Sequence, residues 1–169
     1  GQVGPTRSTG GSGQMLVEAR LAGTSPDTAP LIAAYVGVNP GTTYVLAVAN
    51  TLARLQIAPI PIATANLLST DARVQVYNAL PEGPRILVKT SDNVIIADGL
   101  GWVEDPVSLN LVGGQYRLIG ATSDIPATLL FDQVRSLEPG TVTTVIVTGQ
   151  PLQTIFVTTR PGAQVVTAP

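Results

Sequence analysis

Proline and glycine interrupt this sequence so often that a long helix has no room to form. The 169 residues include 14 Pro and 17 Gly. No window of about 11 residues or more shows a helical apolar period without one of them. Because proline and glycine instead favour turns between short extended segments, the sequence predicts an all-β protein.

Runs rich in apolar and β-branched residues fill the intervals between these turns. We expect strands at residues 14–21, 31–38, 43–49, 55–62, 73–79, 85–90, 94–100, 107–111, 114–121, 128–134, 141–148 and 152–159. Pro59 and Pro61 make the fourth run an edge strand or an extended connector, since proline cannot donate to a ladder. A short helix is expected at 63–69. Many short strands with frequent turns predict an antiparallel β-sandwich or barrel, and an internal repeat indicates an additional half-module.

An internal repeat supports the half-module. Residues 39–48 (NPGTTYVLAV) align with residues 138–147 (EPGTVTTVIV), and Leu55-Gln56 matches Leu152-Gln153. Chance similarity between Val/Thr-rich strands is the alternative explanation.

If the repeat is genuine, residues 14–68 correspond to the closing half of the module that 72–161 complete. The sequence then divides into four parts. These are a flexible Gly/Ser-rich tail at 1–13, a partial module at 14–68, a sandwich module at 69–161 and a C-terminal tail at 162–169.

The composition argues against most kinds of chemistry. The chain has no His and no Cys, which excludes disulfides, His general bases and the usual nucleophilic triads and zinc sites. Charged residues make up 12% of the chain, and Lys89 is the single lysine, so no basic stripe for nucleic acid exists. We therefore expect a protein that is not an enzyme and needs no cofactor or metal.

Residues 72–81 (ARVQVYNALP) resemble the opening strand of the bacterial family called domain of unknown function 4397. The segments 86–88, 114–116 (GQY) and 137–141 (LEPGT) match later strands and turns of that family. The sequence departs from it at Leu80, where serine is usual, and at 143–144, where Tyr-Thr is usual. The resemblance covers residues 72–161. It implies an immunoglobulin-like sandwich on exported, surface-attached proteins and brings no catalytic residue.

Two groups of residues could bind a ligand. Asp92, Asp98, Glu104 and Asp105 are the densest acidic set and could supply oxygen ligands to Ca²⁺, although their spacing matches no calcium loop. A turn and a solvated loop explain them equally well. Trp102, the single tryptophan, could stack on a sugar or pack against the core.

Several features favour a location outside the cell or on its surface. The sequence begins with Gly1 and its single methionine is Met15, as expected after removal of an export signal or after trimming for expression. The longest apolar run, residues 55–68, is interrupted by Pro59 and Pro61 and is too short to span a membrane.

We expect a structural subunit of an extracellular filament or surface layer, which binds copies of itself by strand addition. Residues 1–21 would be the intermolecular element. Its hinge would be the glycines Gly10, Gly11 and Gly13, and its apolar face would be Met15, Val17, Ala19 and Leu21.

Three alternatives remain open at this point. Residues 14–21 pair within their own sandwich and only 1–13 reach out; residues 163–169 bridge subunits instead; or the chain is an adhesion or glycan-binding module of a cell-surface protein.

Overall fold

The computed structural model describes residues 13–21, 23–25, 27–49, 54–80, 83–102, 104–149 and 153–161. The two expected tails, apart from Gly13, therefore lie outside the described residues. Within the described part of the chain the secondary structure is built from strands, without an α-helix. The predicted all-β class is confirmed.

Every interval predicted to be extended contains a strand, with ends that differ by a few residues at most. The strands are β1 (Gly13–Ala19), β2 (Ile32–Val38), β3 (Tyr44–Ala49), β4 (Gln56–Pro61), β5 (Asp71–Ala79), β6 (Ile86–Thr90), β7 (Ile95–Leu100), β8 (Val107–Val112), β9 (Gly114–Thr122), β10 (Leu129–Leu137), β11 (Val142–Thr148) and β12 (Gln153–Thr159).

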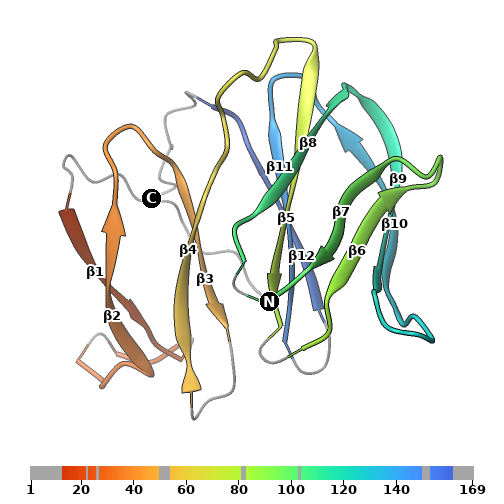
Figure 1. Ribbon diagram of the computed structural model, residues 1–169. Helices are drawn as coiled ribbons and strands as arrows, with labels where there is room; N and C mark the ends of the chain where they lie inside the picture. Colours follow the sequence, from red (N-terminus) through yellow and green to blue (C-terminus); the bar gives the residue numbers. More distant parts are fainter. Residues whose placement is uncertain are drawn as a thin grey trace.

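Strands β5 to β12 form a sandwich of two four-stranded sheets (Figure 1). One sheet has the order β10-β9-β6-β7 and the other β12-β11-β5-β8. Valines and leucines from both sheets fill the space between them, including the fully buried Val74, Val76, Leu118 and Val145. All pairs of neighbouring strands are antiparallel except β5 and β11, which run parallel. The first strand of the sandwich, β5, thus pairs with β11, which comes much later in the chain.

The hairpin of β3 and β4 covers the outer face of the β12-β11-β5-β8 sheet as a third layer. Ala49 and Ile60 of the hairpin pack against Tyr77, Ala79 and Ile146 of the sheet. Strand β5 is consequently buried on both faces, and all its residues after Asp71 are buried. This explains why apolar side chains of β5 point to both faces of the sheet and not to one face only.

Two polar side chains of β5 attach the segment that follows β4 to this outer face. The Gln75 amide nitrogen donates to the Pro61 carbonyl at 2.7 Å, and its oxygen accepts from the Ala63 backbone N–H at 3.0 Å. Arg73 donates to the carbonyls of Ala63 and Ala65. Gln75 is fully buried, so these bonds satisfy polar groups that would otherwise be costly to bury.

The helix predicted at 63–69 is wrong, and the same contacts explain why. The segment forms turns instead. Arg73 occupies the carbonyls of Ala63 and Ala65, which a helix would need for its own hydrogen bonds. Asn66 also adopts a positive φ of 57°, which lies outside the helical region.

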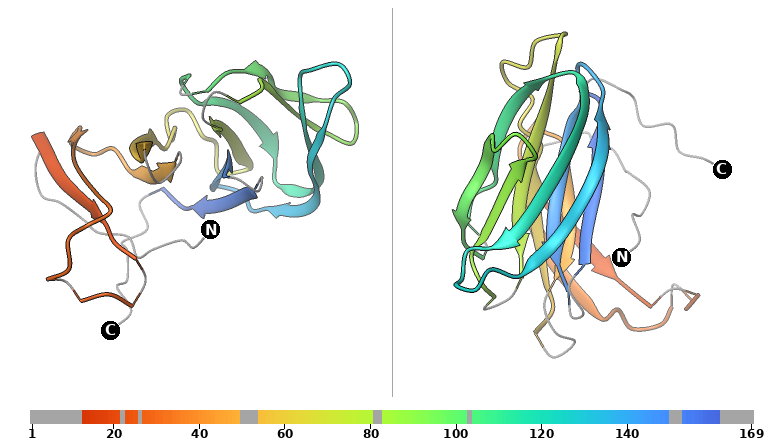
Figure 2. Two further views of the ribbon diagram at one scale, coloured as in Figure 1. Left: turned by 90° about the horizontal axis from the view of Figure 1, so that it is seen from below. Right: turned by 90° about the vertical axis from the view of Figure 1, so that its right-hand side faces the viewer.

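The hairpin of β1 and β2 lies beyond β3 and β4, on the side away from the sandwich (Figures 1 and 2). Strand β2 contacts β4, and Val36 is its buried residue. Met15, Val17 and Ala19 are half-buried on the face of β1 that Val36 shares. The two N-terminal hairpins therefore enclose a small apolar interior of their own.

These four strands repeat the last four strands of the sandwich, pair by pair. In the first hairpin of each set, Gly13 pairs with Val38 as Gly114 pairs with Leu137. In the second hairpin of each set, Tyr44 pairs with Pro61 as Thr143 pairs with Thr158. Strands β1 to β4 thus correspond to β9 to β12 with the same cross-strand register.

The turn between the two hairpins is also repeated. Gly41 and Gly140 have φ angles of 70° and 74°, which favour glycine. The following threonine N–H donates across each turn, from Thr42 to the Asn39 carbonyl at 3.3 Å and from Thr141 to the Glu138 carbonyl at 3.2 Å. Sequence, register and turn geometry agree, so the internal repeat is structural as well as sequential.

We predict that Gln75→Ala destabilises the fold by about 2–4 kcal/mol, because it removes the hydrogen bonds to the Pro61 carbonyl and the Ala63 N–H and leaves a cavity where the fully buried Gln75 side chain was. Urea denaturation followed by fluorescence measures this. Gln115→Ala, at an exposed position of β9, is the matched control and should change stability little. Equal losses for the two variants would contradict the role assigned to Gln75.

Candidate functional site

The candidate site is the edge of β3 that faces away from β4, which is unpaired among the described residues. Within the described residues β3 pairs with β4 alone. Its counterpart β11 pairs with β12 on one side and with β5 on the other. The N-terminal half-module, defined here as β1 to β4, therefore lacks a neighbour at the position that β5 occupies in the complete module.

The backbone groups that point away from β4 follow from the hydrogen-bond alternation of an antiparallel pair. The Ile62 N–H donates to the Thr43 carbonyl at 2.8 Å, so Thr43 belongs to the set of residues that bond β4. The intervening residues Tyr44, Leu46 and Val48 direct their N–H and C=O groups to the free edge. Their counterparts in β11 direct the same groups to β5, since the Arg73 N–H donates to the Thr141 carbonyl.

Prolines close the opposite edge of this two-stranded sheet. Pro59 and Pro61 lie opposite Leu46 and Tyr44, at positions that do not bond β3. An N–H at either position would point outward from β4, and proline has none. Because proline on an edge strand prevents unwanted pairing, β4 is protected while β3 is left able to accept a strand.

Apolar side chains beside the free edge of β3 are more exposed than their counterparts in β11. Val48 of β3 is 44% exposed, whereas its counterpart Val147 in β11 is fully buried. Leu46 is half-buried, whereas its counterpart Val145 is fully buried. Leu46 and Val48, which face the interior of the half-module, are thus only partly covered, and an added strand would cover them.

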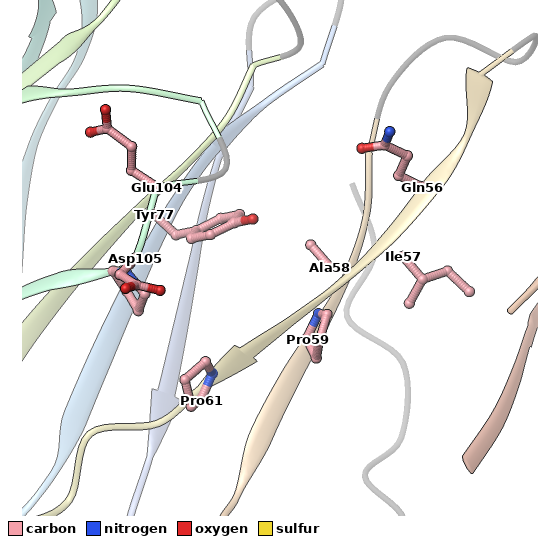
Figure 3. A pocket seen from close by; sticks show the side chains of 9 residues that line it. Gln56, Ile57, Ala58, Pro59, Pro61, Tyr77, Glu104 and Asp105 are labelled. Atoms are coloured by element: carbon pink, nitrogen blue, oxygen red, sulfur yellow. The ribbon is translucent and has the colours of Figure 1, made fainter. Parts of the chain in front are cut away.

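A separate hollow of ≈ 220 Å³ lies between β4 and the outer face of β5 (Figure 3). The Tyr77 ring points from β5 toward β4, while the Glu104 carboxylate points away from β4. Burial raises the pKa of Tyr77, so its phenol stays neutral. The hollow lies at the seam between the β3–β4 hairpin and the sandwich.

The Glu104 carboxylate is occupied by contacts within the fold. It accepts a 2.7 Å bond from the Gly101 backbone N–H and a 3.0 Å bond from Arg85. Arg85 also donates to the Gly99 carbonyl. The Gly101 N–H, and then the Arg85 charge, lower the pKa of Glu104. This carboxylate therefore holds the loop before β8 in place.

Of the other acidic candidates, Asp105 lies beside Glu104 at the hollow. Asp92 and Asp98 are exposed in the turn after β6 and on β7, and Asp105 is exposed before β8. Among the described residues, no group of three or more His, Cys, Asp or Glu side chains could hold a metal ion. Trp102 is half-buried in the loop between β7 and β8.

The predicted assembly residues lie in and around β1. Gly13, Met15, Val17 and Ala19 belong to β1, which pairs with β2 of its own chain. Leu21 is exposed just after the strand. Gly10 and Gly11 fall outside the described residues. Strand β1 itself is paired within its own chain along the edge that faces β2.

Sequence reasoning did not single out the edge residues Tyr44, Leu46 and Val48. The repeat between 39–48 and 138–147 carried the signal. Residues 138–147 include most of β11, which pairs with β5 in the sandwich. The corresponding strand β3 has no such neighbour among the described residues. Pro59 and Pro61 predict an edge strand, and β4 is one among the described strands, but only the register shows which edge the prolines close.

Comparison with known proteins identifies no relative: no family model, no curated protein and no solved structure matches this chain. Within the described residues, no helix has the length and apolar character needed to cross a membrane.

We predict that Glu104→Gln lowers stability at neutral pH but not in acid. Because the pKa of Glu104 is lowered in the folded state, its contribution is present above the usual glutamate pKa of about 4.3 and is lost as pH falls through the lowered value. Urea midpoints of wild type and variant, measured from neutral pH down to about pH 2–3, should converge on acidification. A gap that stays constant across this range would contradict the prediction.

Proposed function

We propose that this chain is a non-catalytic structural subunit, exported from the cell, that assembles with copies of itself into a filament or surface layer by strand addition. The observation that carries the proposal is the unpaired edge of β3 beside partly exposed apolar side chains. Natural proteins seldom leave such an edge bare unless it receives a partner.

The structure of the subunit suits a polymer more than a closed dimer. A half-module that lacks strands and a segment of a neighbour that supplies one are different surfaces, so their contact is heterologous. Contacts of this type generate open filaments when the rotation between subunits does not close a ring. The complete module between them would act as a rigid spacer.

Export is supported by composition and by resemblance. The weakly charged chain and the resemblance of residues 72–161 to domain of unknown function 4397 both fit a bacterial cell-surface protein. The alternative, an adhesion or glycan-binding module, would use aromatic rings. Tyr77 in the hollow is only 6% exposed, so its ring has no free face on which a sugar could stack. Tyr35 of β2 is 69% exposed but does not line that hollow.

We predict that the purified chain forms regular filaments by electron microscopy and that Val48→Pro abolishes them while preserving the fold. Proline removes the N–H that points to the free edge without breaking a bond to β4, as Pro59 already does on the other strand.

Val48→Thr, which keeps the N–H and the β-branched shape, is the control and should still assemble. Circular dichroism checks that both variants remain folded. A wild-type chain that stays monomeric at high concentration, or a Val48→Pro variant that polymerises normally, would contradict the proposal.

A further inference from the structure

In the complete module, the strand beside β11 has a defined direction, register and chain position. β5 runs parallel to β11, with Val76 opposite Val145 and Asn78 opposite Val147. Val76 and Asn78 point into the sandwich and are buried. By the correspondence of β3 with β11, the free edge of β3 accepts a parallel strand of the β5 type, with alternate side chains entering the half-module.

The segment directly before β1 is not the counterpart of that strand. The strand before β9 is β8, and β8 pairs with β5 rather than with β11. One strand therefore separates the β8 position from β11. By the same correspondence, a segment directly before β1 would match β8, whereas the place beside β3 matches β5. The sequence of 1–12 agrees, since it contains Pro5 and four glycines.

The C-terminal sequence contains a β5-like segment. Residues 163–168 read AQVVTA, and residues 74–79 of β5 read VQVYNA. The Gln, the following Val and the final Ala coincide. The segment carries no charge, and its Val-Val-Thr run has high β propensity. It follows β12 in the sequence after only three residues, 160–162.

We propose that residues 163–168 of one chain add to the free edge of β3 in a second copy, parallel to it. Val165 then lies opposite Leu46 and Thr167 opposite Val48, as Val76 and Asn78 lie opposite Val145 and Val147. Ala163, Val165 and Thr167 enter the half-module beside its partly covered apolar residues. The inference rests on the proposed function and specifies its donor and its acceptor.

This arrangement links subunits head to tail. Each chain offers an acceptor in its N-terminal half-module and a donor after its last strand. The two ends are different, so every subunit binds two neighbours and the polymer has a direction. Backbone hydrogen bonds supply most of the affinity in such strand addition, and the alternate side chains set the register.

The chain contains no cysteine, so a designed pair tests the register directly. In Val48→Cys/Thr167→Cys the two side chains would face each other on adjacent strands, within the reach of a disulfide. Mild oxidation should produce a ladder of covalent oligomers on non-reducing gels. Val48→Cys/Val166→Cys places the second thiol on the opposite face and should cross-link at least about tenfold less.

Deletion of 162–169 separates the possible outcomes. The truncated chain should remain folded, since β1 to β12 are intact, and should form no filaments. Loss of filaments on this deletion but not on deletion of 1–12 supports the proposal. If filaments persist without 162–169, or the cysteine pair closes within a single chain, the donor is wrong while the proposed function stands. If the full chain never polymerises, the proposed function itself fails.

Discussion

Strand β5 is the element on which the rest of the structure depends. Its backbone joins β11 and β8 into one sheet, its valines fill the sandwich core, and its opposite face receives the β3–β4 hairpin. Gln75 and Arg73 add hydrogen bonds to the segment after β4. The complete module and the half-module are therefore connected through the two faces of a single strand, and disturbance of β5 would affect both.

The same strand defines what the N-terminal half-module lacks. β1 to β4 reproduce β9 to β12 in register and in turn geometry, yet the position beside β3 that corresponds to β5 is empty among the described residues. Prolines close the β4 edge, while the β3 edge keeps its donors and acceptors. The proposed strand addition rests on this asymmetry rather than on the mere presence of exposed apolar residues.

Much of the fold follows from local sequence, whereas the site does not. Turns such as Asn39-Pro40-Gly41 and the β-branched runs between them are local signals, so the strands were predictable. The helix expected at 63–69 was wrong because Arg73 and Gln75, several residues away, hold that segment. The free edge at Val48 exists because no described strand lies beside β3 in the way that β5 lies beside β11. The local residue pattern of β3 does not show whether such a neighbour is present. The repeat alone hinted at it.

The central claim is that the backbone groups of Tyr44, Leu46 and Val48 are free in the isolated subunit and bonded in the polymer. Amide hydrogen exchange at these residues measures this directly. We expect fast exchange at Val48 and slow exchange at its counterpart Val147 in monomers, and slow exchange at both after assembly. An amide at Val48 that is as protected in the monomer as Val147, or that stays unprotected in the polymer, would contradict the account.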